Sequence, residues 1–358
     1  MILVLLFLHL FLQPPAQAAE AAQASAQAKV LLQSGIDAEN HHDIDHALVE
    51  FRKAAELDPS SSEVLLRLGD AYMKKHDAAQ AIPPLKRAAE LTPDSVPIHQ
   101  LLGYALLAQG FAAEAIPHLE LAHDAGALGI AYLENDEPAK AMVNLQSALE
   151  GDPGNPDLLF YEGRAATATA SQSTGKLLAA FPNSARAHQT RGLSYYQMKM
   201  IPEAVKEYEQ AIAIRSDLPG LHLELGEIYA GRAEWPKAEE EFRAETKLQP
   251  GSAEAAFRLG DALVQEGKMT EAADELRRSD SLHPNMPETL YAMGRALAAA
   301  DAGAAEQALT SVLKIEQNTS LAAQADLLLA SIHRKQGKSA LANREMEDYR
   351  RIRGLRGE

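Results

Sequence analysis

Residues 221–250 read LHLELGEIYAGRAEWPKAEEEFRAETKLQP. Small and large apolar side chains recur in this stretch at fixed spacings, and the positions that define the pattern are Leu225, Gly226, Tyr229, Ala238, Phe242 and Pro250. A small residue lets two paired helices approach closely, and large residues fill the space on either side. A proline ends the second helix because it cannot continue one. The stretch therefore predicts two packed helices joined by a turn.

The same pattern recurs along the chain at a nearly constant interval. Its glycines stand at positions 35, 69, 103, 129, 163, 192, 226, 260 and 294, with successive intervals of 34, 34, 26, 34, 29, 34, 34 and 34. A second series of small residues follows most of these glycines by 12 positions and is itself followed, four positions later, by a large residue. Nine units in one register leave little room for chance.

This pattern resembles the tetratricopeptide repeat, a helix–turn–helix of about 34 residues with the signature L-G-x-x-Y, then A-x-x-x-F, then P. The resemblance extends over residues 28–352. It implies an all-α fold, a right-handed superhelical solenoid of about nine to ten helix–turn–helix repeats. The chain departs from the family because the tryptophan that often opens a unit is absent, and because two of the intervals are short.

The two short intervals divide the chain into segments of different regularity. We expect an N-terminal array over residues 28–122, irregular short repeats over 123–183, a C-terminal array over 184–352 and a tail over 353–358. Within the irregular segment, Gly175 is expected to interrupt a weak helix.

The N-terminus has the pattern of an export signal. Residues 2–12, ILVLLFLHLFL, form an apolar run that is shorter than the ~20 residues needed to span a bilayer. Ala16-Gln17-Ala18 then fits a small-x-small cleavage site. We expect a signal peptide at 1–18, a linker at 19–27 and a periplasmic or extracellular location. The positive residue that usually precedes the apolar run is missing, so an uncleaved anchor or a misassigned start remains the alternative.

Composition removes several classes of function. The net charge of −16 repels phosphate, which argues against nucleic-acid binding and against direct binding of the mature chain to anionic membranes. The absence of cysteine excludes disulfides, a thiol nucleophile and thiolate zinc sites.

Helix ends are also predicted from the repeat. The turn inside a unit suits a left-handed glycine at Gly110, Gly267 and Gly337. The N-cap of a following helix is expected at Ser60, Asp94, Asn183, Ser252 and Asn285.

The resemblance also implies a binding surface. In this family the first helix of each unit lines a concave groove, and the residues of this chain at the groove positions are Leu66, Asp70, Met73, Gln100, Tyr104, Leu107, Phe160, Arg164, Gln189, Tyr196, Glu227, Phe257, Asp261, Tyr291 and Arg295. Tyrosine and arginine are residue types that often anchor a partner. The basic cluster with which some family members hold acidic peptide tails is not found at these positions.

Other motifs of the sequence do not predict a metal, nucleotide or catalytic site. His41-His42-Asp43-Ile44-Asp45-His46 has metal-ligand residue types, but it falls on the turn of the first unit, where Asp43 is expected to cap a helix. Residues 170–176 resemble a phosphate-binding loop, yet Leu177 replaces the required Ser or Thr. The HExxH, GxSxG and GxGxxG motifs are all missing. We therefore expect no metal, no cofactor and no enzymatic activity.

Two functions remain. The leading hypothesis is a non-enzymatic scaffold that binds a peptide segment or partner protein, of unknown identity, in the groove. The alternative is a module that binds a small molecule, glycan or lipid chain, with Tyr104, Phe160, Tyr196 and Tyr291 as stacking surfaces. Exposed solenoid ends also allow self-association.

Overall fold

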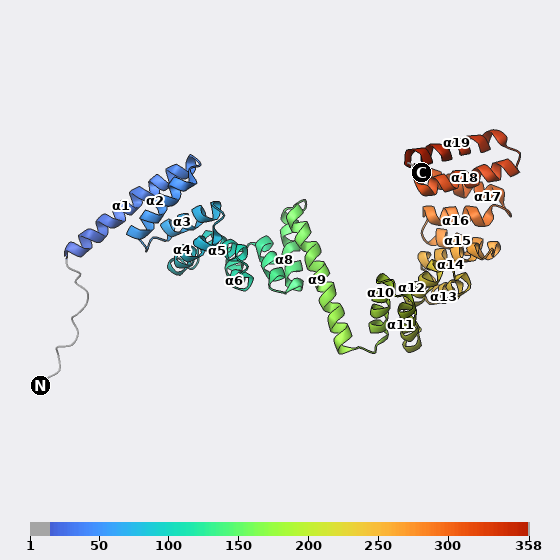
Figure 1. The fold of residues 1–358 in the computed structure, drawn as a ribbon, viewed down its shortest axis with the longest axis horizontal. Helices are drawn as coiled ribbons and strands as arrows, with labels where there is room; N and C mark the ends of the chain where they lie inside the picture. Colours follow the sequence, from blue (N-terminus) through green and yellow to red (C-terminus); the bar gives the residue numbers. More distant parts are fainter. Residues whose placement is uncertain (1–14, 357–358) are drawn as a thin grey trace. The chain divides into compact units, whose positions relative to one another are not determined.

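The computed structural model describes residues 15–356, and every regular element in that range is a helix. The chain divides into two compact units, unit 1 (Met1–Ser173) and unit 2 (Thr174–Glu358), whose helices follow one another in chain order (Figure 1). The expected all-α helical-repeat solenoid is confirmed. No described helix is both long enough and apolar enough to span a membrane.

Unit 1 holds four consecutive helix pairs followed by the start of a long single helix. The helices of the pairs are α1 (Pro15–Asn40), α2 (Ile44–Leu57), α3 (Ser62–Lys74), α4 (Ala78–Leu91), α5 (Val96–Ala108), α6 (Ala112–Ala122), α7 (Ala125–Glu134) and α8 (Pro138–Gly151). The single helix is α9 (Pro156–Ala180), which crosses the boundary between the units.

Unit 2 continues with five helix pairs. They are formed by α10 (Ala185–Gln197), α11 (Ile201–Ile214), α12 (Leu221–Gly231), α13 (Trp235–Leu248), α14 (Ala253–Gln265), α15 (Met269–Leu282), α16 (Pro287–Leu297), α17 (Ala302–Ile315), α18 (Ser320–Lys335) and α19 (Ser339–Arg356). Each helix packs mainly on its neighbours in the sequence, as expected for a stack of repeats.

The repeat glycines lie where the two helices of a pair touch. A Cβ atom added at Gly226 would lie 2.6 Å from the ring of Phe242, and one at Gly260 would lie 2.6 Å from Leu276 Cγ. The same contact joins Gly35, Gly69, Gly103, Gly129, Gly192 and Gly294 to the large residue that follows about half a repeat later. These large residues are fully buried, so the small-against-large packing predicted from the sequence is confirmed at eight of the nine glycines.

At Gly163, the remaining repeat glycine, the structure differs from the prediction for the irregular segment. Nothing lies within 4 Å of a Cβ placed on Gly163, and α9 continues through Gly175 to Ala180 without a turn. The position 16 residues after Gly163 is Ala179, which is too small to fill the space between two paired helices. With no side chain to hold a second helix against the first, the segment forms one helix of 25 residues.

The predicted linker at residues 19–27 is also corrected, because it belongs to α1. Its alanine-rich sequence favours a helix, and the Ser25 hydroxyl donates a hydrogen bond to Asp58 at 3.2 Å. The signal-peptide prediction falls on residues 1–14, which lie outside the described range, and on the first residues of α1. At the other end, α19 runs to Arg356, so most of the predicted tail is helical.

The helix ends follow the prediction only in part. Gly110, Gly267 and Gly337 have positive φ, as expected. Among the N-caps only Ser252 is correct; the other helices begin one residue later than predicted, with N-caps at Ser61, Ser95, Ser184 and Met286. A serine hydroxyl accepts the backbone N–H at three of the five sites, those of Ser61, Ser184 and Ser252.

Candidate partner-binding face

The structure places all fifteen predicted groove residues on the first helices of repeats or on α9. In unit 1 they lie on α3 (Leu66, Asp70, Met73), α5 (Gln100, Tyr104, Leu107) and α9 (Phe160, Arg164). In unit 2 they lie on α10 (Gln189, Tyr196), α12 (Glu227), α14 (Phe257, Asp261) and α16 (Tyr291, Arg295). Most are half-buried, whereas Phe160 is 62% exposed.

In unit 1 the polar members are bonded to one another or to a neighbouring helix. The Tyr104 hydroxyl donates a hydrogen bond to Asp124, and the Gln100 amide donates to the same carboxylate at 3.0 Å. Burial, together with Asp124, raises the pKa of Tyr104 to about 12. Burial opposes ionisation of Asp124, but hydrogen bonds from Tyr104, Ala127 and Gln100 outweigh it and lower the pKa of that carboxyl. Because Asp124 is also the N-cap of α7, this network fixes the junction between two repeats.

Two further links in unit 1 join successive first helices. Lys74 pairs with Asp70 at 2.7 Å and with Glu39 of α1 at 3.0 Å, and these hydrogen bonds raise the pKa of Lys74 against the opposing effect of burial. Arg164 of α9 donates to Glu134 of α7 at 3.1 Å. The charged groove positions of unit 1 are therefore largely neutralised within the unit.

Unit 2 has a similar series of side-chain links between its successive first helices. Gln189 Nε2 of α10 donates to Glu224 Oε1 of α12 at 2.9 Å. Arg258 Nη2 of α14 lies 2.7 Å from Glu227 Oε1 of α12. Arg295 Nη1 of α16 lies 3.7 Å from Asp261 Oδ1 of α14. We call this surface the first-helix face, made of Gln189, Tyr196, Glu224, Glu227, Arg258, Asp261 and Arg295.

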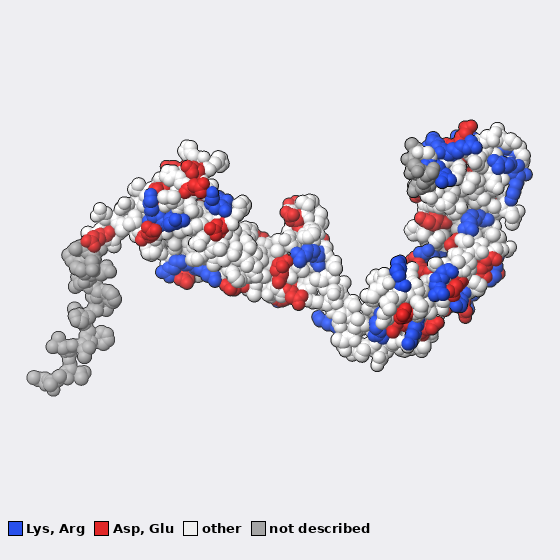
Figure 2. Space-filling model, viewed as in Figure 1, with Lys and Arg blue, Asp and Glu red and all other residues white. Residues whose placement is uncertain are grey.

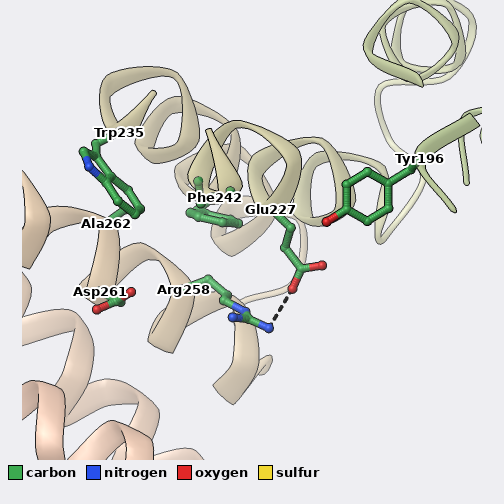
Figure 3. A pocket seen from close by; sticks show the side chains of 9 residues that line it. Tyr196, Glu227, Trp235, Phe242, Arg258, Asp261 and Ala262 are labelled. Carbon is green, nitrogen blue, oxygen red and sulfur yellow. Dashed lines mark ion pairs between the residues drawn. The ribbon is translucent and has the colours of Figure 1, made fainter. Parts of the chain in front are cut away.

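A pocket of about 330 Å³ opens on the first-helix face. Its lining consists of Tyr196, Glu227, Ala230, Gly231, Trp235, Phe242, Arg258, Asp261 and Ala262. Figure 3 shows the Tyr196 ring directed toward Glu227, with the Glu227–Arg258 ion pair beside it and Trp235 on the far side of Phe242. Three predicted groove residues, Tyr196, Glu227 and Asp261, therefore converge on one pocket from α10, α12 and α14.

Three stretches of the chain match models of known repeat families. A family model described as "Tetratricopeptide repeat" matches residues 32–96 and 223–287, and one described as "TPR repeat" matches residues 192–231. The chain is a tetratricopeptide-repeat protein. Proteins of this family are in general non-catalytic scaffolds for protein–protein interaction.

Solved structures resemble this tetratricopeptide-repeat protein at low identity. The crystal structure of MamA has a TM-score of 0.44 and 18% identity, and the match covers 46% of this chain and 96% of that one. The Cut9–Hcn1 structure has a TM-score of 0.42 and 13% identity, with coverages of 94% and 89%. Yeast Tom70 has a TM-score of 0.37 and 13% identity, with coverages of 91% and 92%. None of the curated proteins compared with the sequence matches it.

In this tetratricopeptide-repeat protein, three residues outside the predicted groove positions are also candidates for partner binding. Arg258 directly follows the predicted groove residue Phe257, and Glu224 occupies the equivalent position of the preceding repeat. Both side chains form links between the first helices of unit 2. Trp235, the first residue of α13, also lines the pocket. Both charged residues stand two positions before the glycine of their repeat, and this shared position could have identified them from the sequence.

The four aromatic residues proposed as stacking surfaces are divided between the two units. Tyr104 and Phe160 belong to unit 1, whereas Tyr196 and Tyr291 belong to unit 2. Tyr104 is engaged with Asp124, and Tyr291 is half-buried, so that its pKa is raised by burial. Only Tyr196 is both partly exposed and on the wall of the pocket.

The other sequence motifs have structural roles. The Asp43 carboxylate accepts a hydrogen bond from the backbone N–H of His46 at 3.0 Å and caps α2, as predicted. Within the residues that the structure describes, no group of three or more His, Cys, Asp or Glu side chains is arranged to hold a metal. Residues 170–176 lie inside α9 and form no loop.

Proposed function

We propose that this protein binds an extended peptide segment of a partner protein on the first-helix face of unit 2. The observation that carries the proposal is the pocket on that face, where Tyr196, Glu227 and Asp261 meet from three successive first helices. A peptide that runs across the first helices would contact several repeats in turn. Aromatic and charged side chains around a partly desolvated pocket are typical of interface anchors.

The surface around the pocket supports a specific interaction. On the face shown in Figure 2, acidic and basic side chains are interspersed along each unit. Adhesion by charge alone is therefore disfavoured, and recognition depends on local complementarity. A closed site for a small molecule is less well supported, because Glu227, Arg258 and Asp261 each keep more than a third of their side-chain surface exposed.

We also propose that the protein works outside the cytoplasm. The apolar run at residues 2–12 and the Ala16-Gln17-Ala18 sequence support export, and the absence of cysteine is compatible with an oxidising compartment. N-terminal sequencing of the protein purified from its native cells tests this proposal. A mature chain that begins at residue 19 would support it, and an intact N-terminus in the cytoplasmic fraction would contradict it.

Selection of random peptides displayed on phage, with the purified full chain as target, tests the binding function. Peptides that bind the wild-type chain should lose about ten-fold in affinity on Tyr196→Ala, a loss of ~1.4 kcal/mol. Phe181→Ala is the matched control, because Phe181 also belongs to unit 2, is 64% exposed and does not line the pocket.

The outcomes separate the alternatives. Peptides that bind the wild type and the Phe181→Ala variant but not the Tyr196→Ala variant support the proposal. Peptides that bind all three equally place the contacts elsewhere. If no peptide is enriched, the peptide-binding function is contradicted.

A further inference from the structure

We infer that the pocket on the first-helix face receives one positively charged side chain, lysine or arginine, of the bound peptide. The inference rests on the proposed function and adds the chemical class of the residue that is recognised. It is carried by the charges, the aromatic ring and the small residues of the pocket lining.

The charges that line the pocket do not balance. Glu227 and Asp261 contribute two negative charges, and Arg258 contributes one positive charge. On the first-helix face outside the lining, Glu224 adds one carboxylate and Arg295 adds one cation, so the face keeps the same excess of one negative charge. One cation would therefore bring the lining to neutrality, and near a protein surface the attraction is stronger than in bulk water.

Asp261 is the carboxylate best placed to accept such a cation. Arg295 lies 3.7 Å from its Oδ1 atom, a distance beyond that of a hydrogen bond. Gln265 approaches the same oxygen only at 3.5 Å. By contrast, Arg258 is already held by Glu227 at 2.7 Å. A guanidinium or ammonium group would make the short, charge-assisted hydrogen bond to Asp261 that the protein itself does not make.

An acidic side chain fits this site poorly. It would meet the carboxylates of Glu227 and Asp261, and the single cation of the lining, Arg258, is already paired with Glu227 and lies 3.7 Å from Glu254. An acid bound there would have to share the Arg258 guanidinium with Glu227 and would meet the repulsion of the remaining carboxylates. Charge complementarity therefore favours a basic residue.

The aromatic wall also suits a cation. The Tyr196 ring points toward Glu227 (Figure 3), and the ammonium of Lys199 already lies 5.8 Å from the centre of that ring. A long basic side chain could pack its methylene stem against the ring while its charged end reaches the carboxylates.

Small residues leave space in the pocket. Ala230, Gly231 and Ala262 line it, and nothing lies within 4 Å of a Cβ placed on Gly231. A large side chain at position 231 would therefore occupy the pocket without displacing the core and without changing any charge.

Trp235 provides a direct readout, because it is the one tryptophan of the chain and it lines the pocket. In a proton–nitrogen correlation spectrum of the full chain, its indole N–H gives a single side-chain signal. The probes are N-acetyl-arginine amide, its neutral isostere N-acetyl-citrulline amide, and N-acetyl-glutamate amide. The arginine probe should shift the indole signal in a saturable manner, with an affinity at least about ten-fold above that of either comparator.

Three variants locate the binding. Asp261→Asn and Gly231→Leu should each reduce the response to the arginine probe by at least about ten-fold, the first by removing a charge and the second by filling the space. Gly151→Leu is the matched control for the latter, since Gly151 also ends its helix and has nothing within 4 Å of an added Cβ. The control should respond as the wild type does.

The outcomes for the pocket differ from those for the proposed function. An equal response to arginine and citrulline, or a response that survives Gly231→Leu, overturns the inference. Selected peptides that need Tyr196 but tolerate replacement of all their basic residues by alanine also overturn it, while peptide binding on this face stands. Selected peptides that lose about ten-fold in affinity when one basic residue is replaced support it.

Discussion

The Oε1 atom of Glu245 accepts a hydrogen bond from the backbone N–H of Gly220 at 2.8 Å. Glu245 is fully buried on α13, and its Oε2 atom accepts the N–H of Leu223 at 3.3 Å. Gly220 is the N-cap of α12 and has no side chain with which to satisfy these donors. The second helix of the repeat therefore caps the first, and its negative charge faces the positive end of the α12 dipole.

Replacement of Glu245 by alanine should lower the free energy of unfolding by about 2–3 kcal/mol, because it leaves buried N–H groups without an acceptor. Glu245→Gln keeps one acceptor oxygen and should cost about 1 kcal/mol. Urea denaturation followed by circular dichroism measures both. The exposed Glu240 on the same helix is the control, and an equal cost for Glu240→Ala would contradict the capping role.

Two glycine-to-alanine variants test the packing of the repeats. Gly260→Ala places a Cβ 2.6 Å from Leu276 Cγ and should cost about 1–3 kcal/mol. Gly163→Ala meets no atom within 4 Å and should stabilise α9 by up to about 1 kcal/mol, through helix propensity. In hydrogen exchange, the loss of protection for Gly260→Ala should centre on α14, α15 and their neighbours. Uniform loss across unit 1 as well would contradict nearest-neighbour coupling.

The turns offer a reciprocal pair of substitutions. Ala233 has φ +55° at the turn after α12, and Gly267 has φ +79° at the equivalent turn after α14. Ala233→Gly should stabilise the protein by up to about 1 kcal/mol, and Gly267→Ala should destabilise it by about 1 kcal/mol, since an L-residue pays a steric cost in this region. Thermal unfolding of the two variants measures the changes, which should have opposite signs.

The interaction between His222 and Glu241 should make the protein less stable at high pH. His222 Nδ1 lies 2.6 Å from Glu241 Oε2, and this hydrogen bond raises the pKa of His222 although burial opposes the shift. The folded state thus holds the proton more tightly than the unfolded state. The stabilisation is complete below about pH 6.5 and is lost as the pH rises through the raised pKa. The difference between wild type and His222→Gln in denaturant unfolding should shrink by about 1 kcal/mol from acidic to alkaline pH, and a difference independent of pH would contradict this.

The pair of His99 and His118 predicts the opposite dependence in unit 1. The two rings stack with centroids 5.1 Å apart, and their Nδ1 atoms are 2.9 Å apart. Burial lowers the pKa of His118, and the charges of His99 and Lys86 lower it further. The unfolded state therefore takes up a proton first, so stability is complete above about pH 6.5 and is lost as the pH falls below it.

Hydrogen exchange of α5 and α6, corrected for the intrinsic pH dependence of exchange, measures this effect. Protection should fall between about pH 7 and pH 5 in the wild type, and it should fall less in the His118→Gln variant. An equal fall in both would contradict the role of His118.

The sequence by itself determined the all-α repeat fold and the contacts within each repeat. Gly226 and Phe242 are only 16 residues apart, and two helices joined by a short turn bring such positions together whatever surrounds them. The same reasoning placed a left-handed glycine at Gly110 and Gly267. It failed at α9 because a helix turns back only where a large side chain fills the junction, and Ala179 cannot do so.

Only the tertiary structure decided which groove residues act together. Tyr196, Glu227 and Asp261 come from three repeats, and the pocket that they share depends on how closely α10, α12 and α14 stack. The reach of Arg258 to Glu227 likewise depends on side-chain rotamers and on the spacing between neighbouring repeats. A repeat pattern specifies that each first helix presents a face, but the charges that meet on that face are determined by packing between repeats, since those distances are not encoded in any single unit.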